Sequence, residues 1–288
     1  MPVRSGRGPA AVTGLPARVQ AVRSLDLALP PAPMPLWRRG SALKRWRYLG
    51  VFSPELLLCV GQARIGPLPR TWWAVARPGG ELLEGARRGR VRMTHSTVSV
   101  DAVSAQIRLD LEGGEGVETA SPAGTRGNYS WTSKRAGVGV RGTAVIDGTS
   151  HRLEGPYGFV DESAGYHARH TTWRWSAGHG LTEDGRQVAW NLVTGIHDAP
   201  AASERTLWVD SSPRELGPVT FATDLSGVSF SEGGGLVFDE WCAREEQTNL
   251  LVVRSSYRQP FGTFSGWLPD DLRLARGYGV MEYHDVHW

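Results

Sequence analysis

Turn signals divide this chain into short strand-like runs, and no run of eleven or more residues has the apolar spacing of an amphipathic helix. In residues 105–112, apolar and polar side chains alternate as in a half-buried strand. Asp147-Gly148 and Asp184-Gly185 have the composition of tight hairpin turns. Such runs recur at intervals of about 8 to 14 residues, which predicts an all-β protein with a barrel or sandwich arrangement.

The segment 155–197 predicts a hairpin with large side chains on both faces. On its first strand His167, Trp173 and Trp175 share one face, because successive side chains of a strand alternate. On the return strand Trp190 lies on the apolar face and Asn191 on the opposite face. A strand with one side in water would carry one plainly polar face. We therefore expect a curved sheet with a packed outside and a lined inside.

The length favours one large β domain or two consecutive modules. A chain of 288 residues can bury a substantial core, and two modules would have roughly 130 residues each. The predicted strands, roughly sixteen to eighteen, suit two barrel-like halves. We expect a basic, Pro- and Arg-rich segment at residues 1–38, an N-terminal module at 39–155 and a C-terminal module at 156–288.

Positive charge is concentrated at the N-terminus. Residues 1–47 contain nine Arg or Lys and one acidic residue, whereas the remainder contains 23 basic and 28 acidic residues. The N-terminal segment has too little apolar periodicity to fold alone, so we expect it to be disordered or laid across the surface. Its charge suits peripheral contact with a membrane or an acidic partner. The mildly acidic body argues against a nucleic-acid groove.

The sequence predicts a cytoplasmic protein. It has no stretch of 18 consecutive apolar residues, and the N-terminus lacks the apolar core of a secretory signal. Cys59 lies in an apolar run and Cys242 follows a Trp, as expected for small buried side chains in a reducing compartment. A disulfide between them stays open as the alternative.

Several motifs, taken in order and spacing, resemble the bacterial family labelled domain of unknown function 2804. The resemblance covers about residue 40 to the C-terminus, and no single motif carries it. The motifs are Lys44-Arg45-Trp46-Arg47-Tyr48, Asp161 through Gly165-Tyr166 to Thr172-Trp173-Arg174-Trp175, Asn191-Leu192-Val193-Thr194-Gly195, Phe261-Gly262-Thr263-Phe264-Ser265-Gly266, Gly279-Val280-Met281-Glu282-Tyr283-His284, and Trp288.

That family is similar to the double-calycin group of carotenoid 1,2-hydratases (hydroxyneurosporene synthase), tocopherol cyclase and AttH-like proteins. The resemblance implies two consecutive lipocalin-like (calycin) β-barrels or strongly curved antiparallel sheets. It also implies a hydrophobic cavity for an isoprenoid or lipid-like molecule. In the enzymes of the group, an acid protonates a carbon–carbon double bond and aromatic walls shelter the resulting cation.

Asp161 and Glu282 are the candidate proton donors, because their aromatic and apolar neighbours would keep a carboxyl group neutral near pH 7. His284 shares a face with Glu282 on an extended strand and is expected to orient it. The alternative for Asp161 is a turn or cap carboxylate. The alternative for Glu282 is an ion pair with Arg254 or Arg276.

Aromatic residues are the candidate substrate-binding groups. The rings of Tyr166, Trp173, Trp175 and Trp190 could each stabilise a carbocation by roughly 0.5 to 2 kcal/mol. Asn191, next to Trp190, is assigned to the same binding surface. The alternative for any one of these rings is a place in the packed core.

We expect no metal and no cofactor. The pairs His167/His170 and His284/His287 have a spacing that points the two rings to opposite faces of an extended strand. Only a loop geometry, completed by a carboxylate and His197, would bring a pair to one ion. The sequence also lacks a phosphate-binding loop before a helix, a nucleophile elbow and a Cys-x-x-Cys pair.

Three functions suit these patterns, and the sequence leaves open whether the protein is an enzyme. The first is cofactor-independent, acid-catalysed hydration, cyclisation or isomerisation of an unsaturated hydrophobic molecule. The second is non-catalytic carriage of a lipid or isoprenoid, for which the cavity would lack titratable groups. The third is action on a sugar, which needs two carboxyl groups facing each other about 5 to 10 Å apart in an open cleft.

Overall fold

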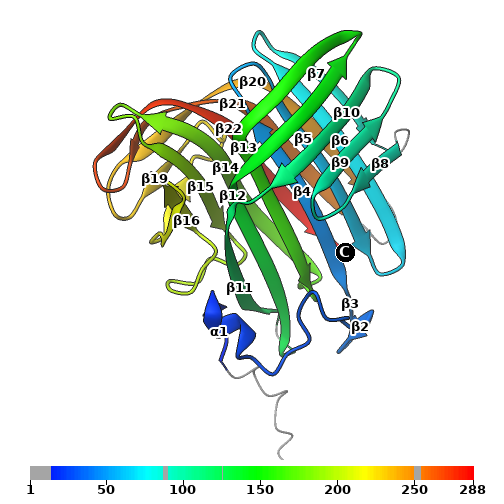
Figure 1. Ribbon diagram of the computed structural model, residues 1–288. Helices are drawn as coiled ribbons and strands as arrows, with labels where there is room; N and C mark the ends of the chain where they lie inside the picture. Colours follow the sequence, from blue (N-terminus) through cyan, green and yellow to red (C-terminus); the bar gives the residue numbers. More distant parts are fainter. Residues whose placement is uncertain (1–13, 87–89, 125, 250–253) are drawn as a thin grey trace, which may run out of the picture.

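Two large antiparallel sheets, standing side by side, make up the protein (Figure 1). The computed structural model describes residues 14–86, 90–124, 126–249 and 254–288. Its one α-helix in these ranges, α1, has four residues (Gln20–Arg23), and nearly everything else that is regular is strand. The all-β prediction is confirmed, and the two curved sheets match a double-calycin-like fold.

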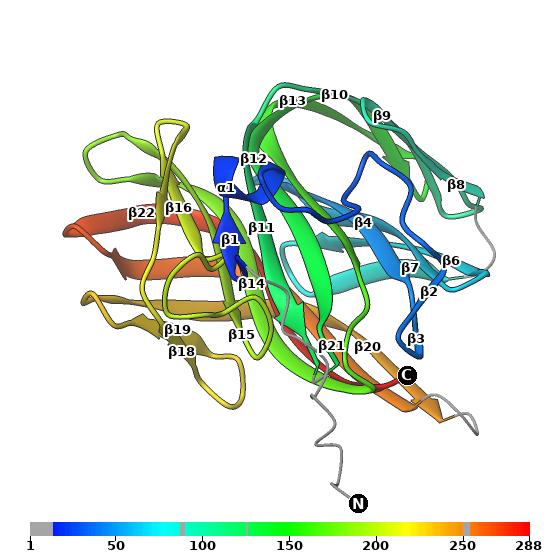
Figure 2. The ribbon, with the colours of Figure 1, turned by 90° about the horizontal axis from the view of Figure 1, so that it is seen from below.

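The first sheet has eleven strands, in the spatial order β7-β6-β5-β4-β13-β12-β10-β9-β8, with β11 paired to β12 and β1 paired to β11. The strands are β1 (Ala17–Arg18), β4 (Lys44–Phe52), β5 (Leu57–Ile65), β6 (Leu68–Arg77), β7 (Glu81–Ala86), β8 (Arg90–Met93), β9 (Thr97–Asp101), β10 (Ala105–Glu112), β11 (Glu115–Ala123), β12 (Asn128–Ile146) and β13 (Thr149–Gly165). Seen from below, β8, β9 and β10 arch over β4 and β6 (Figure 2).

The second sheet has nine strands, in the order β17-β16-β15-β14-β22-β21-β20-β19-β18. They are β14 (His170–Thr182), β15 (Gln187–Thr194), β16 (Thr206–Val209), β17 (Ser212–Glu215), β18 (Val219–Phe221), β19 (Gly227–Phe230), β20 (Gly235–Asn249), β21 (Arg254–Leu268) and β22 (Leu272–His287). The predicted Asp-Gly turns at Asp147-Gly148 and Asp184-Gly185 join β12 to β13 and β14 to β15. Positive φ values at both glycines fit this role.

Three apolar clusters hold the two sheets. Aliphatic side chains dominate the cluster of the first sheet, which includes Leu49, Leu58, Val60, Ile107 and Val140. The cluster of the second sheet is richer in rings and includes Trp190, Phe238 and Phe264. A third cluster, with Phe52, Cys59, Phe159, Trp175 and Phe261, joins strands of both sheets. Strands such as β4 and β5 therefore bury both faces, which explains why apolar residues are so nearly continuous along them.

The predicted boundary between modules at residues 155 and 156 falls inside β13, which belongs to the first sheet along its whole length. The chain changes sheets between Gly165 and His170. The two cysteines, Cys59 and Cys242, are free thiols. Within the described residues, no helix is long and apolar enough to cross a membrane.

Part of the N-terminal segment is ordered on the first sheet. Of the predicted disordered segment 1–38, residues 1–13 lie outside the described residues. Residues 14–38 include β1, α1 and β2 (Trp37–Arg38), which pairs with β3 (Ser41–Ala42). Val22, Leu29 and Met34 are buried there against Tyr129 and Trp131. Residues 14–38 thus lie across the first sheet, the second of the two expected arrangements, because their spaced apolar side chains find a partner surface that the segment alone does not provide.

Candidate functional site

A cavity of about 160 Å³ lies between the two sheets. Its walls come from β4, β5, β6, β12 and β13 of the first sheet and from β14, β15, β20, β21 and β22 of the second, with Ile196, His197, Glu204 and Trp288 from outside the strands. The family resemblance implies lipocalin-like barrels or curved sheets and a hydrophobic cavity. The interiors of the curved sheets are occupied by their apolar clusters, and this cavity forms where the sheets meet.

The pairing of β14 with β22 builds one wall. Trp175 is opposite Glu282, and Trp173 is opposite His284. Because alternate residues share a face, all four side chains point to the same side, and all four line the cavity. The structure therefore brings together four of the residues that the sequence singled out.

Three donors hold the carboxyl group of Glu282. Trp173 Nε1 donates to Oε1 at 2.7 Å, while Tyr257 Oη and Gln259 Nε2 each donate to Oε2 at 3.0 Å. Burial raises the pKa of Glu282 to about 7, against the lowering effect of the hydrogen bonds from Trp173 and Tyr257. Asp161 also raises this pKa and Lys134 lowers it. Near neutral pH, both protonation states of Glu282 are therefore accessible.

Asp161 lies in a second charged group within the cavity wall. Lys134 Nζ is 2.6 Å from Asp161 Oδ1 and 3.4 Å from Glu204 Oε1, and all three side chains are buried. Burial lowers the pKa of Lys134, but the two carboxylates outweigh it and raise the pKa, so the amine stays charged. For Asp161, burial and Glu204 raise the pKa while Lys134 lowers it, and the net shift is upward. The single positive charge of Lys134 therefore balances only one of the two neighbouring carboxyl groups, Asp161 and Glu204.

Aromatic side chains form most of the apolar wall. They are Trp46, Tyr48, Trp72, Trp173, Trp175, Tyr257 and Trp288. Lys134 Nζ lies 5.9 Å from the Trp175 ring centroid, and Tyr48 meets that ring edge to face at 5.6 Å. Gly61 on β5 lets the Trp72 ring cross its strand, since a Cβ there would come within 2.2 Å of the ring. The Trp175 face already lies next to one cation.

Several polar atoms in the cavity wall are buried without a hydrogen-bond partner among the described residues. They include Tyr48 Oη, Thr132 Oγ1, His197 Nδ1 and Glu204 Oε2. A buried polar atom without a partner costs about 1 to 3 kcal/mol, so such atoms in a cavity usually serve water or a ligand. Together with Asp161, these groups make one part of a largely apolar cavity polar.

His284 lies in the wall but does not bond to Glu282. Its Nε2 is 2.7 Å from Ser255 Oγ, and its ring packs against those of Trp173 and Tyr257. Burial lowers the pKa of His284 to about 3, so the imidazole is neutral. Its predicted orienting role would have to act through these two rings, which carry two of the donors to Glu282.

The remaining predicted binding residues lie outside the cavity wall. Asn191 supports it from behind, accepting from Trp175 Nε1 at 2.7 Å and donating to the Glu204 carbonyl at 2.8 Å. Trp190 is buried in the cluster of the second sheet. Tyr166 packs on the N-terminal segment and donates to the Pro35 carbonyl.

Two of the three donors to Glu282 and the cation of the site were not predicted from the sequence. Tyr257, Gln259, Lys134 and Glu204 had no local signal that related them to Glu282 or Asp161. One signal was available, since Lys134 is one of only two lysines among 32 basic residues. Neither suggested alternative describes the carboxyl groups: within the described ranges Glu282 forms no ion pair, and Asp161 lies within the long strand β13. A close group of metal-ligating side chains exists on the opposite face of β14 and β22, outside this cavity.

The family model described as Domain of unknown function (DUF2804) matches residues 78–288. The chain belongs to this family. The match confirms the resemblance seen in the motifs, and it begins after the first of them, Lys44 to Tyr48. The comparison with curated proteins yields no match.

Among solved structures, this DUF2804 protein is similar to one described as AttH from Nitrosomonas europaea, with 12% identity and a TM-score of 0.53. The match covers 90% of this chain and 98% of that one. It is also similar to kievitone hydratase from Nectria haematococca, with 11% identity, a TM-score of 0.50, and coverage of 83% and 88% respectively. At these identities the likeness shows a common fold.

Proposed function

We propose that the protein is an enzyme that adds a proton to a carbon–carbon double bond, with Glu282 as the general acid. The supporting observation is a carboxyl group whose pKa is raised to about 7 and which is held by three donors in a tryptophan-lined cavity. A general acid works best when its pKa lies near the working pH. The product is a hydrated, cyclised or isomerised molecule.

In the proposed step, neutral Glu282 gives its proton to one alkene carbon. The π electrons form the new C–H bond, and the neighbouring carbon becomes a cation. Glu282 becomes a carboxylate, which suits the three donors from Trp173, Tyr257 and Gln259 better than the neutral acid does. The faces of Trp173 and Trp175 stabilise the carbocation by roughly 0.5 to 2 kcal/mol per ring.

The second half of the reaction takes place at the polar part of the cavity. A water molecule in that part adds its oxygen to the cation and loses a proton to Asp161 or to Glu204, which both line the cavity. In a cyclisation, a second double bond attacks the cation instead, and the same carboxylates accept the proton that is lost. Lys134 keeps one carboxylate ionised for this purpose.

The size of the cavity restricts the substrate. About 160 Å³ is close to the volume of an engineered apolar cavity that holds one benzene molecule, roughly 150 Å³. The cavity therefore encloses the reacting end of an isoprenoid or lipid-like substrate, and a longer chain would extend past the partly exposed Trp46 and Trp288. A similarly folded protein named a hydratase is compatible with this chemistry.

The other two interpretations fit the site less well. A carrier was expected to have no titratable groups in its cavity, whereas Glu282, Asp161, Glu204 and Lys134 all line it. A sugar-active enzyme needs two carboxyl groups that both face the substrate, whereas Asp161 is engaged by Lys134.

Proton donation can be tested without a known substrate. The protein is incubated in D2O with a panel of unsaturated isoprenoids and fatty acids, and mass spectrometry detects deuterium on carbon. We expect incorporation into at least one compound, reduced about 10² to 10⁴-fold in Glu282→Gln. Glu245→Gln is the matched control, because that carboxylate is exposed and pairs with Arg258 on the surface. Equal incorporation by Glu282→Gln and the wild type would remove the acid assignment.

A further inference from the structure

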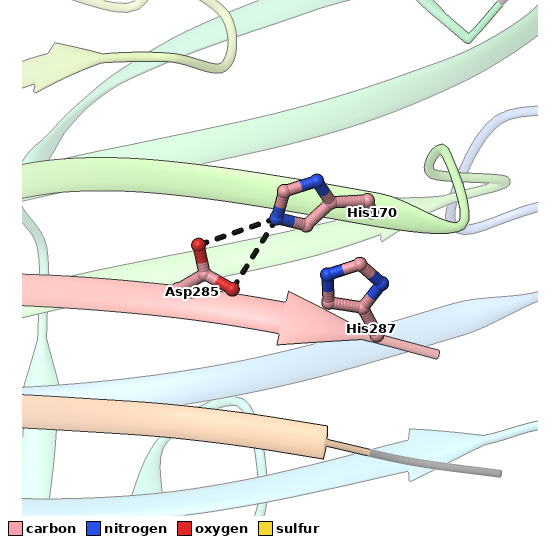
Figure 3. A group of neighbouring side chains, drawn as sticks. All are labelled: His170, Asp285 and His287. Atoms are coloured by element: carbon pink, nitrogen blue, oxygen red, sulfur yellow. Dashed lines mark hydrogen bonds and ion pairs between the residues drawn. The ribbon is translucent and has the colours of Figure 1, made fainter.

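The face of β14 and β22 turned away from the cavity carries two histidines and an aspartate that converge at the end of both strands (Figure 3). His170 begins β14, and His287 ends β22 directly opposite it. Asp285 precedes His287 by two residues and so shares its face. Spacing along the sequence relates only histidines of the same segment, such as His284 and His287. The antiparallel pairing of β14 with β22 instead places His170 next to His287.

The geometry is close to that of a three-ligand metal site. The ligand atoms of His170, Asp285 and His287 all lie within 4.8 Å of one another. His170 Nε2 is already 3.2 Å from Asp285 Oδ2, while the two imidazole rings stack at 3.9 Å. Ligands bonded to Zn²⁺ at about 2.0 to 2.2 Å in a tetrahedron are roughly 3.3 to 3.6 Å apart. The planes of the two stacked rings are only 13° apart, so the exposed His287 ring has to rotate before both nitrogens face one ion.

The surroundings support the ligands and leave room for an ion. Thr172 Oγ1 donates to Asp285 Oδ2 at 2.9 Å and thereby fixes the carboxylate that faces His170. The side chains of His170 and Asp285 are 53% and 34% exposed, so an ion can enter and can keep water ligands. Two imidazoles and one carboxylate form a ligand set that Zn²⁺ uses in sites with an open coordination position.

We propose that His170, Asp285 and His287 bind one Zn²⁺ ion. The ion joins the first residue of β14 to the end of β22, one residue before Trp288. Trp288 lines the cavity and its backbone N–H donates to the Arg169 carbonyl next to His170. Zn²⁺ therefore holds together the ends of β14 and β22, whose other face forms one wall of the cavity.

The test is calorimetric titration of the full, untagged chain with Zn²⁺ alone. We expect one equivalent to bind, and we expect His170→Gln, Asp285→Asn and His287→Gln each to weaken binding at least tenfold. His95→Gln is the control, because His95 is exposed on the first sheet and has no such neighbours among the described residues. Absence of binding to the wild type, or equal affinity in the three variants, would overturn the proposal.

Co²⁺ identifies the ligands directly. Visible absorption of a four- or five-coordinate ion is expected in the wild type and should be lost in His170→Gln and His287→Gln. A sulfur-to-cobalt charge-transfer band, abolished in Cys242→Ser, would assign the ion to the partly exposed thiol and would exclude the proposed site. Zn²⁺ should also raise the unfolding temperature of the wild type and not that of the three variants.

Discussion

The two faces of the β14 and β22 pair carry similar residues in opposite environments. One face points Trp173, Glu282 and His284 into the cavity between the sheets. The other face, displaced by one residue along each strand, presents His170, Asp285 and His287 at the open end of the second sheet. Each face has a carboxyl group close to imidazole or indole rings, so residue type alone does not separate them.

Burial gives the two carboxyl groups different chemistry. Burial raises the pKa of Glu282 to about 7, so this group can donate a proton near neutral pH. For Asp285, burial raises the pKa, but the hydrogen bonds from Thr172 and His170 and the charge interactions with His170 and His287 together outweigh it and lower the pKa, so this group is a carboxylate. One alternation of strand side chains thus places a carboxyl group with a raised pKa on one face and a carboxylate with a lowered pKa on the other.

Removal of the cation next to the cavity should have the largest effect on stability. Lys134→Met leaves Asp161 and Glu204 buried without their partner, and we expect a loss of about 3 to 5 kcal/mol in the free energy of unfolding. Urea unfolding at pH 7 measures this loss. Arg141→Met, which removes an exposed ion pair with Glu154, should cost under about 1 kcal/mol. Equal losses of stability in Lys134→Met and Arg141→Met would show that the ion pairs of Lys134 are as exposed to water as a surface ion pair.

The pH dependence of stability should depend on Glu282. Its pKa is higher in the folded protein than the ordinary value of 4.5, so the folded state binds the proton more tightly. Stability from this group is full below about pH 4.5 and declines as pH rises to about 7, by up to about 3 kcal/mol.

Gln does not titrate, so Glu282→Gln lacks this decline. The free energy of unfolding of the variant minus that of the wild type should therefore be larger at pH 8 than at pH 5. Urea unfolding at the two pH values measures the difference. The same comparison with Asp285→Asn should show no gain in this window, because the pKa of Asp285 is lowered. An equal pH slope in the wild type and Glu282→Gln would show that Glu282 titrates normally.

Loss of one donor should shift the titration of Glu282. The Trp173 hydrogen bond lowers the pKa of Glu282, so Trp173→Phe should raise that pKa further above 7 and cost about 1 to 2 kcal/mol of stability. Infrared titration of the protonated carboxyl band measures the pKa. Trp267→Phe, at an exposed ring on β21, is the control. An unchanged pKa would contradict the assigned hydrogen bond.

The smallest effect is expected on the exposed face. Thr172→Val removes a donor to Asp285, which should raise the pKa of Asp285 and cost under about 1 kcal/mol, because water replaces the lost bond. Carboxyl NMR titration follows the shift, and the Zn²⁺ affinity should fall severalfold. A stability loss as large as that of Trp173→Phe would break the contrast between the two faces.

The sequence by itself determined the strand class, the hairpin turns and the faces on which side chains lie. Alternation along one strand is a local property, so the sequence predicts that Glu282 and His284 share a face, and likewise Trp173 and Trp175. The family resemblance is also present in the sequence, because it depends on the order of short motifs. Local patterns are therefore sufficient to predict two of the seven rings of the cavity wall, Trp173 and Trp175, together with the carboxyl group of Glu282.

Only the tertiary structure decided which faces meet and how deeply each is buried. Trp173 and Glu282 are 109 residues apart, and Lys134 lies on a strand of the other sheet. Their contacts depend on the register between distant strands and on the packing of two sheets, which local periodicity does not encode. Burial in that interface raises the pKa of Glu282, whereas hydrogen bonds and charge interactions at the strand ends lower the pKa of Asp285.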